Sequence, residues 1–141
     1  MTELNSTKLL DVAEGLNYLH TYHTVHGDLK GVCVIFAKRG GIPSTYLTAS
    51  KPNILIDGSE HARVCDFGLA SIDYGEHIPA WGPRSDKGHT PRWSAPEILS
   101  GKCITSKQAD IFALGMVVVE VRALAEYHRN EVDRVLTLGL R

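Results

Sequence analysis

The sequence predicts a small α+β fold that is mainly helical and contains one short β-hairpin. Two segments show the periodicity of amphipathic helices, one near the start of the chain and one from about Ser106. Between them, two short runs of strand-forming residues flank an Asp-Gly turn. With 141 residues, the chain has room for one small domain with an ordinary hydrophobic core.

The first predicted helix is amphipathic and runs to about His20. Its apolar side chains recur at spacings of three and four residues, at Leu9, Val12, Leu16 and Leu19. Ser6 or Thr7 can cap its N-terminus, because a hydroxyl there accepts a bond from an unpaired helix amide. Gly27 then ends the regular structure.

A hairpin is predicted from strands at 54–56 and 62–65, because Asp57-Gly58 between them is a strong turn signal. The stretch 70–93 has no periodicity and many Gly and Pro residues, so it is expected to be a long loop. Long loops in compact domains are commonly functional or disordered.

The second predicted helix starts near Ser106 and continues through Val117. The apolar run 111–119 is about half as long as a membrane span requires, so we expect a buried element. The formal net charge is −1, so the composition gives no indication of a nucleic-acid or membrane partner. The sequence identifies neither a protein substrate nor an oligomeric state.

The cysteines point to a reducing compartment. Cys33, Cys65 and Cys103 are few, odd in number and lack the C-x-x-C spacing of many metal and redox sites. They are therefore expected to be reduced thiols, and with no apolar signal segment at the start we predict a cytoplasmic protein.

Four short motifs follow one another along the chain, and together they are similar to eukaryotic protein kinases. They are His26-Gly27-Asp28-Leu29-Lys30-Gly31 with Pro52-Asn53-Ile54-Leu55-Ile56, then Asp66-Phe67-Gly68, then Ala95-Pro96-Glu97, then Asp110-Ile111-Phe112-Ala113-Leu114-Gly115. Each motif alone is weak evidence, whereas all of them in the family's order are strong. The resemblance implies a partial kinase-like fold, mainly the helical C-terminal lobe.

The resemblance implies catalytic roles for four residues. Asp28 resembles the base that orients the substrate hydroxyl, and Lys30 resembles the lysine near the transferred phosphate. Asn53 and Asp66 resemble the residues that hold Mg²⁺ and, through it, the phosphates of ATP. The implied reaction is transfer of the γ-phosphate of ATP to a protein Ser or Thr hydroxyl.

Further residues resemble the family's supporting set. His26 and Phe67, with Gly68 after it, resemble the packed group that sets the active geometry. Thr90 lies where the family's substrate loop carries a threonine that contacts the catalytic Asp. Glu97 resembles the anchor at the end of this loop. Asp110 resembles the aspartate that bonds backbone amides of the catalytic loop.

Some departures refine the subfamily. Gly27 replaces the arginine that precedes the catalytic Asp and pairs with a phosphorylated loop, which argues against that form of control. Lys30, two residues after Asp28, favours Ser/Thr over Tyr specificity. The motif strings are most similar to the tyrosine-kinase-like Ser/Thr group, in versions numerous in mushroom-forming fungi.

The 141 residues contain no Gly-rich phosphate-covering loop and no V-A-I-K strand, so the nucleotide lobe is absent from this sequence. The chain also stops soon after Glu120, before the family's remaining helices. We therefore expect no appreciable kinase activity from this chain alone. The alternatives are a non-catalytic pseudokinase or interaction fragment, and a truncated gene product.

Residues 32–51 separate the two halves of the catalytic loop. Asp28 and Asn53 are 53 − 28 = 25 positions apart, and deleting 32–51 restores the family's spacing of five. Codons for Val32-Cys33 can contain a fungal splice donor, which favours a retained intron; a real loop insertion is the alternative. The resemblance covers 9–31 and 52–120. The divergent tail 121–141 is either translated intron sequence, read through from a possible splice donor at Val121-Arg122, or a further helix.

Overall fold

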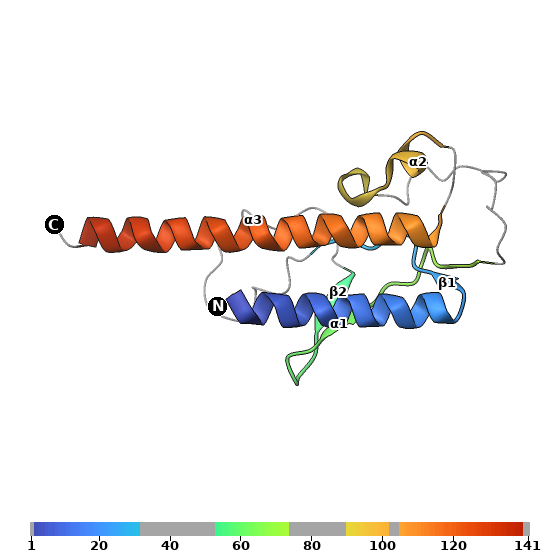
Figure 1. The fold of residues 1–141 in the computed structure, drawn as a ribbon, viewed down its shortest axis with the longest axis horizontal. Coiled ribbons are helices and arrows are strands. Elements are labelled where there is room, and N and C mark those ends of the chain that lie inside the picture. Colours follow the sequence, from blue (N-terminus) through green and yellow to red (C-terminus); the bar gives the residue numbers. More distant parts are fainter. Residues whose placement is uncertain (1, 32–52, 74–89, 102–104, 140–141) are drawn as a thin grey trace.

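The computed structural model describes residues 2–31, 53–73, 90–101 and 105–139 (Figure 1). The elements in chain order are α1 (Thr2–Thr21), β1 (Thr24–Val25), β2 (Ile54–Ile56), β3 (Ala62–Val64), β4 (Ser71–Ile72), the 3₁₀ helix η2 (Pro91–Trp93), α2 (Pro96–Leu99) and α3 (Lys107–Gly139). This helix-rich chain with short antiparallel strand pairs confirms the predicted α+β class. The insert 32–51 lies outside the described residues.

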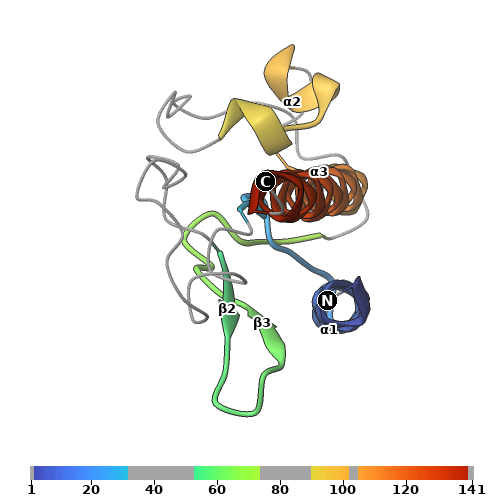
Figure 2. The same cartoon turned by 90° about the vertical axis from the view of Figure 1, so that its left-hand side faces the viewer.

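Two helices form the body of the molecule. α1 and α3 lie side by side and run in opposite directions, and α3 extends past the N-terminal end of α1 (Figure 1). Viewed along the helices, the hairpin β2–β3 lies on one side of α3, and α2 lies on the other (Figure 2). α1 packs on β3 and η2 packs on α3, so α3 separates the hairpin from the segment around Trp93.

The core lies between these elements and draws on every part of the described chain. Its buried side chains are Val12, Leu16, Leu29, Ile54, Ala62, Trp93, Ala113, Val117 and Val121. Leu29, in the motif at 26–31, is among them, with 2% of its surface exposed. Each Å² of apolar surface removed from water stabilises the fold by about 25 cal/mol. This cluster therefore makes the main favourable contribution to the free energy of folding.

The hairpin β2–β3 forms as predicted, but its turn differs in detail. Ile54 pairs with Val64 and Ile56 pairs with Ala62. The residue with left-handed backbone is Glu60, with φ of +67°, and not Gly58. Asp57 closes the longer turn because its side chain accepts bonds from the amides of Ser59 and His61, which allows the chain to take five residues between the strands.

The predicted helix boundaries are partly wrong. α1 begins at Thr2, ahead of the predicted cap at Ser6 or Thr7, because a hydroxyl residue can also lie inside a helix. α3 begins at Lys107, next to the predicted Ser106, and Ser106 Oγ accepts the Ala109 amide at 3.0 Å as a cap does. α3 then continues without a break to Gly139.

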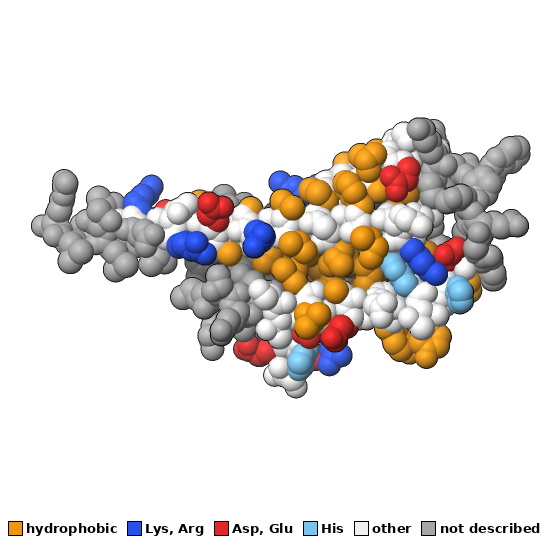
Figure 3. Space-filling view, in the orientation of Figure 1, with side chains coloured by type: hydrophobic (Ala, Val, Ile, Leu, Met, Phe, Trp, Pro, Cys, Tyr) orange, Lys and Arg blue, Asp and Glu red, His pale blue; other side chains and the backbone are white. Residues whose placement is uncertain are grey.

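The apolar run at 111–119 is a helix, as predicted, but it is only half buried. Ala113 and Val117 are buried, whereas Ile111, Phe112 and Val119 are 56%, 39% and 58% exposed. Figure 3 shows apolar side chains gathered over the middle of α3 on one face. α1 and η2 cover the other sides of this helix, which explains why consecutive apolar residues differ in burial.

The predicted loop 70–93 contains two short elements at its ends. β4 pairs antiparallel with β1, with Thr24 opposite Ile72 and Val25 opposite Ser71. η2 begins after Thr90, and residues 74–89 lie outside the described part of the chain. No helix among the residues described has both the length and the hydropathy needed to cross a bilayer.

Candidate functional site

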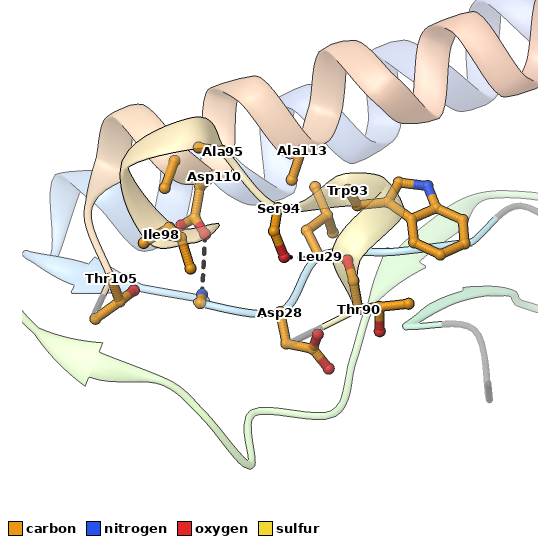
Figure 4. Close-up of a pocket in the computed structure, with 12 residues that line it drawn as sticks. Asp28, Leu29, Thr90, Trp93, Ser94, Ala95, Ile98, Thr105, Asp110 and Ala113 are labelled. Atoms are coloured by element: carbon orange, nitrogen blue, oxygen red, sulfur yellow. Dashed lines mark hydrogen bonds between the residues drawn. The ribbon is translucent and has the colours of Figure 1, made fainter. Parts of the chain in front are cut away.

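A buried carboxylate holds the backbone of residues 26 and 27. Asp110, in the first turn of α3, is 2% exposed. Its Oδ2 accepts the amide of His26 at 2.8 Å. Its Oδ1 accepts the amide of Gly27 at 2.9 Å, which is the dashed line at Asp110 in Figure 4. These are the loop amides that the resemblance assigns to Asp110. Charge-assisted bonds of this kind are about twice as strong as neutral ones, so they fix the loop firmly to α3.

His20 is a third partner of this carboxylate. Its Nε2 lies 2.9 Å from Asp110 Oδ2, and its side chain is 13% exposed. The last turn of α1 is therefore joined to the first turn of α3 through the atom that also holds His26. The sequence analysis did not assign this role to His20. The feature that could have indicated it is a histidine in the last turn of the helix just before the loop.

Asp28 and Lys30 form a close ion pair beside a pocket. Lys30 Nζ lies 2.6 Å from Asp28 Oδ2, and the two side chains are 12% and 11% exposed. Asp28 lines a pocket together with Thr90, Trp93 and Ser94 (Figure 4). The Asp28 carboxylate thus lies at a cavity wall, with its charge balanced by a neighbouring ammonium group.

Asn53 joins the two halves of the split motif. Its Nδ2 donates to the backbone oxygen of Asp28 at 2.6 Å and lies 3.3 Å from Asp28 Oδ2. Its backbone amide donates to the oxygen of Lys30 at 3.1 Å. Asn53 is fully buried, and through these bonds the two segments meet although 25 residues separate Asn53 from Asp28.

The Asn53 amide oxygen is suited to a hard cation. Oδ1 is buried and has no hydrogen-bond partner among the residues described. An unpaired buried oxygen costs free energy unless a donor or a cation meets it. Amide and carboxylate oxygens are the ligands that Mg²⁺ prefers. Asn53 Oδ1, on a side chain that also contacts the Asp28 carboxylate, is therefore of a type that fits this ion.

Asp66 follows the backbone that contacts Asn53. The Cys65 amide donates to the backbone oxygen of Asn53 at 2.9 Å, and Asp66 is the next residue in the chain. Asp66 has left-handed backbone, with φ of +64°, and its exposed side chain accepts the Gly68 amide at 3.4 Å. Burial raises the pKa of the Cys65 thiol, and the Asp66 carboxylate adds to this effect.

His26 connects the loop to the segment that carries Asp66. The Asp28 amide donates to His26 Nδ1 at 3.3 Å, so Nε2 carries the proton that it donates to the Cys65 oxygen at 3.0 Å. The ring of His26 lies 5.4 Å from the ring of Phe67, in a tilted arrangement. His26 is buried, whereas Phe67 is 50% exposed.

The far wall of the pocket comes from η2 and α2. The Thr90 oxygen accepts Ser94 Oγ at 3.0 Å, which holds Thr90 at the start of η2. Trp93 anchors this segment in the core, because its Nε1 donates to Glu120 Oε2 at 3.2 Å. Glu97 lies in the first turn of α2 and is half-buried. Among the described residues, Glu97 takes part in no ion pair with a basic side chain.

The site is thus assembled from four segments that are distant in sequence. The structure brings together Asp28, Lys30 and Asn53, and it places His26, Phe67 and Asp66 in the adjoining segment. Thr90 faces the same pocket as Asp28. Glu97 stands apart, without a side-chain contact to these groups among those described.

Comparisons with known proteins identify the family of the chain. The family described as protein tyrosine and serine/threonine kinase matches residues 2–138. The chain is 35% identical over 111 residues to the mitogen-activated protein kinase kinase kinase YODA of Arabidopsis thaliana, covering 78% of this chain and 10% of that protein. It is 30% identical over 118 residues to the serine/threonine-protein kinase CTR1 of A. thaliana, covering 82% and 11%.

A human protein gives a similar result. The chain is 32% identical over 110 residues to mitogen-activated protein kinase kinase kinase 3 of Homo sapiens, covering 78% of this chain and 14% of that protein. The chain thus spans about a tenth of the length of these curated relatives. The family match over nearly all of its residues is the decisive finding. This chain belongs to the protein tyrosine and serine/threonine kinase family.

Proposed function

We propose that the described residues form the phosphoacceptor side of a protein-kinase active site. The observation that carries this proposal is the Asp28 carboxylate, held between Lys30 Nζ and the Asn53 amide at the wall of a pocket that Thr90 also lines. A hydroxyl in this pocket would donate its hydrogen bond to Asp28, which would take the proton as the oxygen bonds to the γ-phosphorus of ATP; the bond from that phosphorus to the β–γ bridging oxygen would break, and ADP would leave.

Asn53 and Asp66 would hold Mg²⁺ in this proposal. The buried, unpaired Asn53 Oδ1 supports the assignment, and the left-handed backbone at Asp66 presents a second carboxylate in the adjoining segment. When bound, the ion would neutralise charge on the phosphates of ATP. Lys30 would keep the Asp28 carboxylate oriented and would lie close to the transferred group.

The acceptor is proposed to be a Ser or Thr hydroxyl. Lys30 supports this specificity through the resemblance given above, and CTR1, one of the relatives, is a serine/threonine-protein kinase by name. Membership of the tyrosine-kinase-like group from mushroom-forming fungi is proposed from the motif strings alone. A cytoplasmic location is proposed from the cysteines, of which Cys65 is a free thiol in the described part of the chain.

We also propose that these 141 residues, assayed by themselves, transfer no appreciable phosphate. They contain neither a Gly-rich phosphate-covering loop nor a V-A-I-K lysine. Kinase catalysis depends almost entirely on positioning and charge neutralisation of the phosphates, and those two parts supply much of it. Phosphate transfer by the purified chain that Asp28→Asn abolishes would contradict this proposal.

A non-catalytic interaction role is the second candidate. It is favoured by the apolar face of α3 at Ile111, Phe112 and Val119, which no described element covers. Exposed apolar patches of this kind commonly mark interaction surfaces. Thermal unfolding with and without Mg-ATP separates the candidates, because a ligand that binds the folded state raises the unfolding temperature.

The metal site is tested with Mn²⁺ alone, by nuclear magnetic resonance. We expect Mn²⁺ to broaden the side-chain amide signals of Asn53 in the wild-type chain and much less in Asp66→Asn. Asp66 is exposed and Asn accepts left-handed backbone, so this variant should fold. Glu14→Gln removes an exposed carboxylate on α1 and is the matched control. Equal broadening in wild type and Asp66→Asn would reject the proposed site.

A further inference from the structure

The turn that joins β2 to β3 contains the only Asp or Asn of the sequence that glycine follows. This pair is Asp57-Gly58, and the turn projects away from α3 (Figure 2). Glycine has no side chain to hinder its own amide, so the amide nitrogen can reach the carboxyl group of the residue before it. Of all the Asp and Asn residues of the chain, Asp57 therefore has the neighbour that best permits this reaction.

The nucleophile of this reaction is accessible in the structure. Gly58 is exposed, and its amide donates no hydrogen bond to the residues that the structure describes. A Cβ at residue 58 would meet nothing within 4 Å, so the space beside this glycine is open. Burial therefore does not protect the Asp57-Gly58 pair.

The carboxyl group of Asp57 is instead held by three donors. Its Oδ1 accepts the amides of Ser59 at 2.9 Å and His61 at 3.0 Å, and its Oδ2 accepts Arg63 Nε at 2.9 Å. The bond from Arg63, followed by those from His61 and Ser59, keeps the pKa of the Asp57 carboxyl below its ordinary value. Only a protonated carboxyl can release its oxygen as water, so these donors favour the unreactive, ionised form.

The backbone of Asp57 is held as well. Its amide donates to the oxygen of His61 at 2.9 Å, and its own oxygen accepts the amide of Glu60 at 3.1 Å. Ring closure needs the Asp57 side chain to turn toward the Gly58 nitrogen, away from its present partners. The turn must therefore open before the reaction can begin.

We propose that Asp57-Gly58 is a latent site of aspartate isomerisation, which the contacts of Asp57 with Arg63, Ser59 and His61 hold in the aspartate form. In the first step the Gly58 nitrogen loses its proton and bonds to Cγ of Asp57, while the Cγ–OH bond breaks and water leaves. The product is a five-membered succinimide. This proposal does not depend on the proposed function.

The second step is hydrolysis of the succinimide. Water that adds at Cγ breaks the bond from Cγ to the Gly58 nitrogen and restores aspartate. Water that adds at the main-chain carbonyl of Asp57 breaks its bond to that nitrogen and gives isoaspartate. The first step releases the one water that the second step consumes, so no oxidant or cofactor takes part.

The first test follows the reaction in water labelled with ¹⁸O, with the whole purified chain. Each passage through the succinimide places one ¹⁸O atom in the free carboxyl group of residue 57, whichever carbonyl is attacked. Mass spectrometry of the peptide that contains Asp57, released in ordinary water, measures the label. We expect label to enter the folded chain about tenfold more slowly than the chain in guanidinium chloride, where the contacts are absent. Equal rates in both states, or no label at Asp57 in the unfolded chain, would overturn the proposal.

Gly58→Ala is the matched control for the chemistry. The added Cβ hinders the nitrogen of residue 58 but meets nothing within 4 Å, so this variant should fold. Label should enter it more slowly than wild type when both chains are unfolded. Label that enters both unfolded chains at the same rate would overturn the proposal, because the nitrogen of residue 58 would then not be the nucleophile.

Arg63→Gln tests the strongest of the contacts. Arg63 is 66% exposed, so this variant loses the charge without disturbing the core. Label should enter the folded variant about threefold faster than folded wild type, because more of the Asp57 carboxyl is then protonated. In guanidinium chloride the two chains should label alike. Arg129→Gln, at an exposed position of α3, is the matched control, and equal rates in all three folded chains would overturn the role of Arg63.

Isoaspartate should loosen the hairpin. It adds a methylene group to the main chain and turns the Asp57 carbonyl, which accepts the Glu60 amide, into a carboxylate. The Ala62 amide, which donates to Asp11 Oδ2 of α1, should then exchange about tenfold faster in the chromatographically separated isomer, while the His26 amide keeps its protection. Equal protection of Ala62 in both forms would show that Asp57 does not hold the turn.

Discussion

The side-chain amide of Asn53 donates a hydrogen bond to the backbone oxygen of Asp28 at 2.6 Å, across 25 residues of sequence. With the bond from the Asn53 amide to the oxygen of Lys30, it reunites a motif that the sequence divides. The catalytic loop is therefore a tertiary structure in this chain and not a local one. Its conformation is held in part by the bonds that Asn53 makes to Asp28 and Lys30.

Replacement of Asn53 by alanine should destabilise the chain. Asn53→Ala removes both contacts to Asp28 and leaves a cavity at a fully buried position, so we expect a loss of about 2 kcal/mol in the free energy of unfolding. Urea unfolding measures it. Asn17→Ala, at an exposed position of α1, is the control and should change the stability little. Equal stabilities of the two variants would contradict this role.

Asp110 should matter more for stability than His20. Asp110→Ala leaves the buried amides of His26 and Gly27 without an acceptor, so we expect a loss of about 3 kcal/mol. His20→Ala removes one contact and leaves both amides paired, and should cost about 1 kcal/mol. Urea unfolding of both variants, with Glu126→Ala on the exposed side of α3 as control, tests this order. A larger loss in His20→Ala would show that the amides find other acceptors.

Two valines of α3 provide a matched test of the core. Val117 is fully buried and Val119 is 58% exposed, two residues apart on one helix. Val117→Ala should lower the free energy of unfolding by about 2 kcal/mol. Val119→Ala should be neutral or slightly stabilising, because alanine is the better helix former. A comparable loss in both variants would mean that the face at Val119 is covered in solution.

Asp11 should give a pH-dependent contribution to stability. Its carboxylate accepts the Ala62 amide at 2.8 Å, and this bond, with the neighbouring His61, lowers the pKa of Asp11 in the folded chain. A lowered folded pKa adds stability above the unfolded pKa, and this stability is lost as the pH falls through the folded value, below about pH 4. Urea unfolding of wild type and Asp11→Asn should therefore differ most at neutral pH.

The same comparison contains its own check. The difference in stability between wild type and Asp11→Asn should shrink as the pH falls below about 4, because the carboxylate of the unfolded chain, with its higher pKa, then binds protons more than the folded one does. Glu14→Gln, an exposed carboxylate on the same helix, should show little difference at either pH. A difference for Asp11→Asn that stays constant with pH would mean that its charge is not what stabilises the hairpin.

The origin of residues 32–51 is open to a direct test. We propose that they are a retained intron, because their removal restores the spacing of Asp28 and Asn53. Sequencing transcripts across codons 31 to 52 should then reveal a shorter, spliced message. If every transcript carries these codons, the segment is an insertion in the protein. The contact between Asn53 and Asp28 is compatible with both, since loop closure entropy grows only slowly with length.

The sequence predicted those parts of the fold that local pattern controls. The strands around Asp57 and the start of α3 near Ser106 follow from turn and cap chemistry within a few residues. The pairing of β1 with β4 did not follow. Each strand has two residues, too few for a period to show, and the pairing depends on contacts between distant segments.

The same division applies to the candidate site. Motif order and the family resemblance named Asp28, Asn53 and Asp66 as candidates, and their roles stay predictions. The bond from His20 to Asp110 did not follow, since it depends on how distant segments approach in space. The close approach of residue 27 to the Leu69 oxygen, which an added Cβ would meet at 2.7 Å, did not follow either.

The bonds from His26 and Gly27 to Asp110 also constrain the order of events during synthesis. His26 is synthesised 84 residues before its acceptor. At ordinary rates of translation this delay is on the order of 10 s. The bonds that join this loop to α3 can therefore form only after the first turn of α3 has been synthesised, and a chain that ends before residue 110 lacks the acceptor for both amides.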